Sequence, residues 1–217
     1  MGGIVHMEEH RPSSVLNIVE LITGKTNQLR YVERFSNCRT HIKETIAEHC
    51  FFVAYYSLMI THYVNRKTPG TNTVSMGSVL GKALLHDVEE QFTGDIVRPV
   101  KYADDSIRHG INRMCEAMVK DYFVELTDVV SAEDMYTGWH TAKNDTLEGY
   151  IVTFADFLSV LSYLHEEILS GNHIIMRSVS LTNYINKFKS KEYDFIREMV
   201  NATHPIVYNL EQVKRRL

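Results

Sequence analysis

The stretch KALLHDVEEQFTGDIVRPVKY, residues 82–102, begins as an apolar helix and then places His86 directly beside Asp87. Two glutamates, Glu89 and Glu90, follow at once, and the stretch closes with a Thr-Gly-Asp turn and a proline. A neutral imidazole and a carboxylate are good ligands for a divalent ion, although a His-Asp pair alone is common by chance. The question for the rest of the sequence is why an apolar helix leads into these polar residues.

Helical periodicity dominates the chain, and strand-like alternation does not recur. The segment from about Ile46 to Val64 is apolar nearly all round, as expected of a central helix. We predict a single all-α domain, residues 1–217, with six or seven helices. The apolar sets span 15–22, 79–92, 107–119, 147–168 and 181–199, and the breaks fall at 65–73, 93–99, 131–145 and 170–173.

Composition argues against several classes of protein. The 217-residue chain has a net charge of −4 and a pI near 6.3, so we expect no polymeric nucleic acid and no membrane as partner. The first residues lack a signal-peptide pattern, and the apolar run CFFVAYYSLMI is too short to span a bilayer. Three separated cysteines (Cys38, Cys50, Cys115) indicate reduced thiols in a cytoplasmic protein.

Two further polar residues lie on apolar helical segments. His49 falls in the first turn of the most apolar helix, and Asp156 falls within YIVTFADFLSVL. A buried carboxylate is costly unless it is paired or bound to a metal. Taken singly, His49 is more often a hydrogen-bonded core histidine, and Asp156 the partner of a buried arginine. Together with His86 and Asp87, they give an H…HD…D series on three apolar helices.

This series resembles the HD-domain phosphohydrolases. ERFSNCRTHIKETIAEH, HDVEEQFTGDIVRPVKY and FADFLSVLSYLHEEILSGN are similar to three segments of the bacterial 5′-deoxynucleotidase branch. The opening segment is also shared with phage enzymes that hydrolyse deoxynucleoside triphosphates, notably dATP. The likeness covers about 34–172, so we expect an HD-domain helical bundle on which the helices of 173–217 pack.

The resemblance implies a metal centre and two catalytic acids. One divalent ion (manganese, cobalt, zinc, iron or magnesium) would be held by His49, His86, Asp87 and Asp156. A bound cation lowers the pKa of its water and polarises a phosphoryl oxygen. Glu90 would then handle protons on the nucleophile or the leaving oxygen. The catalytic acids implied by the family pattern are Glu90 and Asp95.

The resemblance also implies substrate contacts, each with a plain structural alternative. Arg34 would clamp the phosphate, unless it is a surface charge. Phe35 stands where relatives often carry tryptophan beside the sugar, unless it only packs in the core. For Lys101, a phosphate contact and a surface position are equally open. We expect Glu89 to be an exposed helix residue. Trp139 and His140, in a predicted loop, either line a pocket for the base or only pack against other residues.

Three functions remain in competition. The first is phosphate release from deoxynucleoside 5′-monophosphates, and the second is triphosphate release from a deoxynucleoside triphosphate. They differ in the positive charge needed beyond the first phosphate, for which the candidates are Arg39, Lys43, Arg98 and Lys101. The third is a catalytically silent nucleotide-binding module. The resemblance further suggests a homodimer, with 173–217 as a candidate interface.

Overall fold

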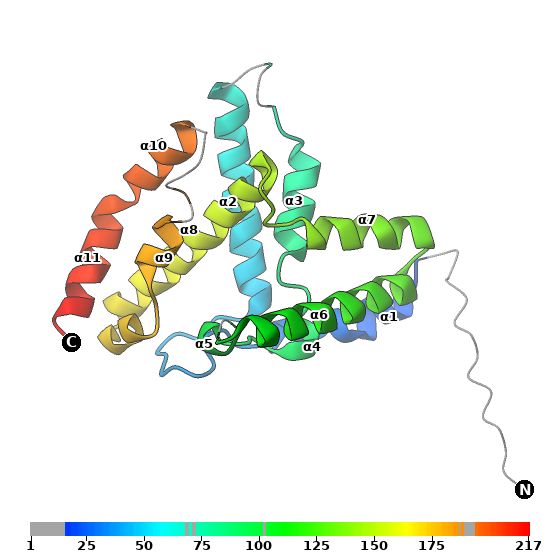
Figure 1. The fold of residues 1–217 in the computed structure, drawn as a ribbon, viewed down its shortest axis with the longest axis horizontal. Helices are drawn as coiled ribbons and strands as arrows, with labels where there is room; N and C mark the ends of the chain where they lie inside the picture. Colours follow the sequence, from blue (N-terminus) through cyan, green and yellow to red (C-terminus); the bar gives the residue numbers. More distant parts are fainter. Residues whose placement is uncertain (1–15, 68–69, 71–72, 102, 187, 189–193) are drawn as a thin grey trace, which may run out of the picture.

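The protein is all-α, as predicted (Figure 1). The structure, a computed structural model, describes residues 16–67, 70, 73–101, 103–186, 188 and 194–217, apart from the side chains of 98–99, 182–184 and 194–195. In this part of the chain, pairing of strand type is limited to an isolated bridge between Glu33 and Thr45. Residues 1–15, Tyr102 and the side chains of Arg98 and Phe195, which entered the predictions above, lie outside the described part.

The described helices outnumber the six or seven expected, because the helix predicted over 79–92 is divided and because helices also form at 98–101, 129–140 and 173–177. The described residues form α1 (Ile18–Thr23), η1 (Lys25–Arg30), α2 (Ile46–Lys67), α3 (Met76–Leu85), α4 (Glu90–Thr93), α5 (Arg98–Lys101), α6 (Asp105–Leu126), α7 (Val129–His140), α8 (Leu147–Leu169), η2 (His173–Arg177), α9 (Leu181–Asn186), α10 (Asp194–Ala202) and α11 (His204–Arg215).

Helix α2 runs through the middle of the molecule and crosses α8 (Figure 1). Its start is fixed by a reciprocal cap: the Glu48 carboxylate accepts the Thr45 backbone N–H at 2.8 Å, and the Thr45 hydroxyl accepts the Glu48 N–H at 3.2 Å. This T-x-x-E capping box satisfies two donors that a helix start otherwise leaves without partners. It sets the position of His49, in the first turn, relative to the rest of the fold.

Helix α8 is the other central element. Thr146 caps it by accepting the Gly149 N–H. Among the described helices, α8 is the one long and apolar enough to cross a membrane, but 67% of its most apolar window is buried inside the protein. That degree of burial is typical of a core helix. The apolar run in α2, considered above, is not part of a helix of this length and hydropathy.

The helix expected over 79–92 is broken, which corrects the sequence interpretation. Helix α3 ends at Leu85, residues 86–89 form a turn, and α4 begins at Glu90. The His86 ring donates to the backbone carbonyl of Ala83 at 2.7 Å, which anchors the side chain beneath the end of α3. Gly94 then ends α4 with φ of 67°, a left-handed conformation that glycine adopts without steric cost.

The break expected over 131–145 is also wrong for most of its length. Residues 129–140 form α7, whose start is capped by Asp128, which accepts the N–H groups of Val130 and Ser131. The polar composition of this segment concealed the helix, although Asp128 is a standard N-cap residue. Trp139 and His140 therefore lie at the end of a helix and not in a loop.

Two hydrophobic clusters make up the described core. The larger joins α2, α3 and α8 with residues of the C-terminal helices, such as Val200 and Leu210. The smaller joins the start of α2, α6 and α7 around Phe123. Helix α2 contributes to both, with Cys50 in the smaller cluster and Val53 in the larger. His49 therefore lies where the two clusters meet.

The segment that follows η1 is held by a buried carboxylate of α8. Glu167 accepts the backbone N–H groups of His41 and Ile42 at 3.0 and 2.7 Å, and it also contacts the Asn172 amide. Asn172 in turn donates to the carbonyl of Arg39 at 2.8 Å. This pair fixes the chain between η1 and α2, and it gives a structural reason for the glutamate and the Gly-Asn of the third quoted segment.

Replacing Glu167 by alanine should destabilise the protein. The His41 and Ile42 N–H groups and the Asn172 amide would lose their acceptor in a buried place, which we expect to cost about 2–4 kcal/mol. Urea unfolding followed by circular dichroism measures this. The matched control is Glu166→Ala, an exposed neighbour on the same helix, for which we expect a change within about 0.5 kcal/mol. Equal stability of the two variants would contradict the assignment.

Candidate metal centre

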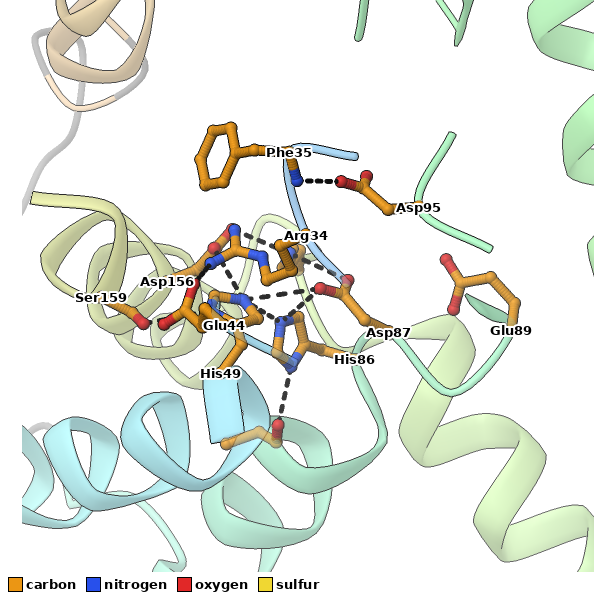
Figure 2. A network of polar contacts seen from close by, with 12 residues as sticks. Arg34, Phe35, Glu44, His49, His86, Asp87, Glu89, Asp95, Asp156 and Ser159 are labelled. Atoms are coloured by element: carbon orange, nitrogen blue, oxygen red, sulfur yellow. Dashed lines mark hydrogen bonds and ion pairs between the residues drawn. The ribbon is translucent and has the colours of Figure 1, made fainter. Parts of the chain in front are cut away.

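Two buried imidazoles face each other at the centre of the molecule (Figure 2). The Nε2 atoms of His49 and His86 are 3.2 Å apart. A carbonyl oxygen can only accept, so His86 Nδ1, at 2.7 Å from the Ala83 carbonyl, carries a hydrogen. In the neutral ring the lone pair is therefore on Nε2. His49 Nδ1 lies 3.0 Å from the Ser159 hydroxyl, which leaves its Nε2 directed at the same point.

Two carboxylates complete this group. Asp87 Oδ2 lies 2.9 Å from His86 Nε2 and 3.5 Å from His49 Nε2. Asp156 Oδ1 lies 3.3 Å from His49 Nε2 (Figure 2). Of the four residues that the sequence predicts as metal ligands, the structure thus groups His49, His86 and Asp87 closely, and Asp156 of α8 joins them through its contact with His49.

The arrangement fits a divalent metal ion. At 3.2 Å the two Nε2 atoms can share one hydrogen, and when both are unprotonated their lone pairs point at one place beside two carboxylates, where a cation can bind. Histidine nitrogen and carboxylate oxygen bind zinc at about 2.0–2.2 Å, which puts ligand atoms of one ion about 3–3.5 Å apart. The ring nitrogens opposite the site are both engaged, as is usual for metal-bound histidine. His49, His86 and Asp87 each offer a ligand atom within 4.8 Å of the others.

Electrostatics at the site favour positive charge between these groups. Although burial opposes it, the Asp87 carboxylate raises the pKa of His86 well above its usual value. Burial likewise opposes ionisation of Asp87, but His86 and Lys143 hold its pKa well below the usual range. The pKa of Asp156 is also lowered, against the effect of burial, chiefly by Lys143.

Lys143 belongs to the site, and the sequence interpretation missed it. Its Nζ lies 2.8 Å from Asp156 Oδ2 and 3.5 Å from Asp87 Oδ1. The partner of Asp156 is thus a lysine, not the arginine considered as the alternative. Lys143 lies in the connection between α7 and α8, and no periodicity or capping pattern in the sequence marks it.

Two glutamates line the next part of the site. Burial raises the pKa of Glu90 to about 9, and the carboxylates of Asp87 and Asp95 act in the same direction. One Glu90 oxygen is buried without a hydrogen-bond partner. The expectation that Glu89 is exposed is wrong, because Glu89 is 9% exposed and accepts the Trp139 indole N–H at 2.7 Å. Burial raises the pKa of Glu89 as well.

Arg34 is buried, not solvated. Its guanidinium donates to Glu44 at 2.6 Å, and the side chain is 12% exposed. Burial opposes its charge, but Glu44 and the more distant Asp156 and Asp87 raise the pKa of Arg34. The backbone N–H of Arg34 donates to the Glu44 carbonyl at 2.9 Å. Glu44 therefore holds both the backbone and the side chain of Arg34 beside the carboxylates.

Phe35 is the one described non-glycine residue with a left-handed backbone, at φ of 55°. Such a conformation is strained for a bulky residue and needs support from its surroundings. The Asp95 carboxylate supplies it by accepting the Phe35 N–H at 2.8 Å (Figure 2). The Phe35 ring stacks on Tyr163, with centroids 5.0 Å apart. Asp95 thus ties the turn after α4 to the segment that carries Arg34.

A cavity of about 290 Å³ opens beside the four-residue group. Its lining includes His86 and Lys143 of the centre, together with Trp139, His140 and Lys101. Lys101, considered for a phosphate contact, thus lies on its wall. The Glu89 carboxylate holds the indole in place, and the His140 ring stacks on that of Tyr136. The other lining residues are Glu89, Asn112, Cys115, Glu116, Ala142 and Asn144.

The family model that matches this chain, together with the fold, defines an HD-domain phosphohydrolase, a hydrolase enzyme. The chain belongs to the YfbR-like 5′-deoxynucleotidase family, whose model matches residues 23–203. A 5′-deoxynucleotidase of Photorhabdus laumondii is 25% identical over 174 residues, which cover 80% of this chain and 87% of that protein. The 5′-deoxynucleotidase YfbR of Shigella boydii is 26% identical over 179 residues, covering 80% and 86% of the two chains. The predicted superfamily and branch are confirmed.

Solved structures show the same fold. An HD-domain phosphohydrolase of Listeria innocua superimposes with a TM-score of 0.66 at 24% identity, covering 91% of this chain and 88% of the other. The HD phosphohydrolase DatZ of cyanophage S-2L, bound to dA and one catalytic Zn²⁺ ion, gives 0.50 at 15% identity, covering 89% and 96%. At these identities the likeness is one of fold.

His49→Gln should abolish tight metal binding. The amide cannot replace an imidazole lone pair, so we expect a loss of affinity larger than the roughly 10–100-fold typical of losing a partner behind a ligand. Metal content after gel filtration, measured by mass spectrometry, reports this. His62→Gln, an exposed residue on the same helix, is the matched control. A His49 variant with native helicity and full metal content would refute the centre.

Glu90→Gln should stabilise the chelator-treated protein at alkaline pH. The carboxyl has a pKa of about 9 when folded and an ordinary value of 4.5, so between these pH values the folded state holds a proton that the unfolded state releases. Folding stability therefore falls as pH rises through this window. We expect the variant to melt at least about 2–4 °C higher than wild type at pH 8.

The difference in melting temperature between Glu90→Gln and wild type should shrink towards pH 5. Near that pH the folded and unfolded states bind the Glu90 proton more nearly equally. Glu125→Gln, an exposed glutamate on α6, should show no pH-dependent gain. The comparison is a thermal melt of each variant at the two pH values. A Glu90→Gln gain that is equal at pH 5 and pH 8 would show that the carboxyl is not held protonated.

Proposed function

We propose that the protein releases phosphate from 2′-deoxyribonucleoside 5′-monophosphates with one divalent metal ion. The observation that carries the proposal is the convergence of the His49 and His86 lone pairs on the Asp87 and Asp156 carboxylates. Membership of a family described as 5′-deoxynucleotidase supports the substrate class. The metal roles of His49, His86, Asp87 and Asp156 are part of this proposal.

The residues around the centre have different roles in phosphoryl transfer. When bound, the metal ion supplies an activated water and polarises a phosphoryl oxygen. Arg34, fixed by Glu44, binds the phosphate through its remaining N–H groups. Glu90, kept protonated by burial and by neighbouring carboxylates, gives its proton to the leaving 5′ oxygen and regains one from the attacking water. Asp95 positions Arg34 and Phe35 through the Phe35 backbone.

The cavity beside the centre suits the nucleoside. At about 290 Å³ it lies near the lower end of ligand-pocket volumes. We place the phosphate at the His86 and Lys143 end and the base near Trp139 and His140, whose rings offer stacking surfaces. The family resemblance implies that Phe35 borders the sugar, although its ring stacks on Tyr163 and is not among the residues that line this cavity. DatZ, a relative in fold, is recorded with dA and one Zn²⁺ ion, which is consistent with a deoxynucleoside here.

The charges favour a monophosphate over a triphosphate. Lys43 is 74% exposed and pairs with Glu33, and Arg39 is exposed. Lys101 and Lys143 line the cavity, but the same wall carries two glutamates, Glu89 and Glu116. A second and third phosphate would need an excess of positive charge, and on the cavity wall the two lysines are matched by the two glutamates.

A hydrolysis panel tests the substrate class. Deoxynucleoside monophosphates, ribonucleoside monophosphates and deoxynucleoside triphosphates are incubated with manganese, cobalt or zinc, and phosphate and triphosphate are detected separately. We expect phosphate release from the deoxynucleoside monophosphates to be fastest. Faster triphosphate release would favour the triphosphohydrolase. Binding without any hydrolysis would favour a silent nucleotide-binding module.

Arg34→Ala should raise KM for the monophosphate by about tenfold or more, because it removes a charged donor that is worth about 1.5–3 kcal/mol. Metal content should remain at the wild-type level, since Arg34 is not among the proposed ligands. Arg113→Ala, an exposed residue of α6, is the control. Unchanged KM in the Arg34 variant would remove this residue from the substrate site.

Two broader predictions accompany this function. We propose that 1–217 form one HD domain, and the packing of α11 against α8 and η2 supports it. We also expect a homodimer. The candidate interface in 173–217 carries exposed apolar side chains such as Tyr208, at 63%, and α2 offers a second candidate with Phe51, at 62%, and Tyr55, at 50%.

A further inference from the structure

Lys143 makes an unusual pair of contacts with the two carboxylates of the metal centre. Its Nζ is 2.8 Å from Oδ2 of Asp156 and 3.5 Å from Oδ1 of Asp87. The opposite oxygen of each carboxylate faces the histidines: Oδ1 of Asp156 is 3.3 Å from His49, and Oδ2 of Asp87 is 2.9 Å from His86. Each aspartate thus turns one oxygen towards the imidazoles and the other towards the lysine.

We propose that Lys143 is a positioning residue that holds both aspartates as one-oxygen ligands of the metal ion. The inference rests on the metal centre of the proposed function and deepens it. One ammonium contacts carboxylates from two separate elements, the turn after α3 and helix α8, and so fixes their relative position. Partners of this kind behind a metal ligand orient it and adjust its binding.

The number of oxygens that each aspartate offers to the metal ion matters for catalysis. A hydrolytic metal site must keep positions open for water and substrate. A carboxylate that binds through both oxygens fills one of those positions. By occupying the outer oxygens, Lys143 leaves each aspartate one oxygen for the metal, and two imidazoles and two oxygens then make four ligands.

The positive charge of Lys143 also favours binding of the substrate. The two neutral imidazoles and two carboxylates carry two negative charges, which a divalent ion alone would neutralise. With Lys143 added, the centre has one net positive charge, which favours binding of a phosphate dianion. Lys143 also lines the cavity beside His86, and a third of its side chain is exposed. Its charge is therefore felt where the substrate would lie.

The test compares Lys143→Met, which removes the charge, with Lys143→Arg, which keeps a charged donor. Chelator-treated proteins are titrated with Co²⁺ by calorimetry, and the visible absorption of the bound Co²⁺ reports its coordination. Lys120→Met, an exposed lysine on α6, is the matched control. Lys143→Gln provides a second neutral variant should the methionine variant not fold, as judged by circular dichroism.

We expect Lys143→Met to weaken Co²⁺ binding by about 10–100-fold and to change the visible spectrum, as an aspartate turns its second oxygen to the metal. Lys143→Arg should restore most of the affinity and the wild-type spectrum, and Lys120→Met should match wild type. Affinity of both neutral variants equal to or tighter than wild type overturns the proposal, whatever the spectrum shows.

The outcome for Lys143 is separable from that of the proposed function. Wild-type protein that binds no Co²⁺ and hydrolyses no deoxynucleotide would refute the metal centre itself. Wild-type protein that binds Co²⁺ and is active, with neutral Lys143 variants of unchanged affinity, would refute only the positioning role. A lysine that merely stabilised the fold would lower the melting temperature without altering the Co²⁺ spectrum of the folded variant.

Discussion

The meeting of two buried imidazoles governs the centre of this molecule. Their Nε2 atoms lie 3.2 Å apart, and their other ring nitrogens are already engaged by a backbone carbonyl and a serine. At this distance the two nitrogens can share a proton, and with both lone pairs free they converge on a single cation. A cation bound at this point requires both lone pairs and the carboxylates of Asp87 and Asp156 to face it, and Lys143 contacts both carboxylates from behind.

The fold meets this requirement by joining rigid and irregular parts. Helices α2 and α8 bring His49 and Asp156 from the core, while the break after α3 lets His86 and Asp87 turn towards them. The segment that carries Arg34 and Phe35 is held from two sides. Glu167 and Asn172 fix its later part, and Asp95 supports its strained residue. Strain of this kind persists only where the surroundings hold it.

Much of the architecture could be read from the sequence. Helices α6 and α8 follow from apolar periodicity, and α2 follows from a segment that is apolar nearly all round, as expected of a central helix. The four proposed ligands follow from the resemblance to HD-domain phosphohydrolases, and the cost of a buried, unpaired carboxylate adds a physical reason for Asp156. Two local predictions are wrong. The polar segment 131–145 is predicted as a break, but most of it belongs to α7, which Asp128 caps, and Glu89 is predicted to be exposed but is buried.

The sequence by itself determined the fold class, the central helices and the chemical identity of the proposed ligands, because hydrophobic spacing and short specific patterns are properties of the chain alone. Only the tertiary structure decided where α3 ends, that Glu89 is buried against Trp139, and that Lys143 contacts both aspartates. These facts depend on contacts between residues far apart along the chain. A connecting segment such as that of Lys143 carries no periodicity from which its partners could be inferred.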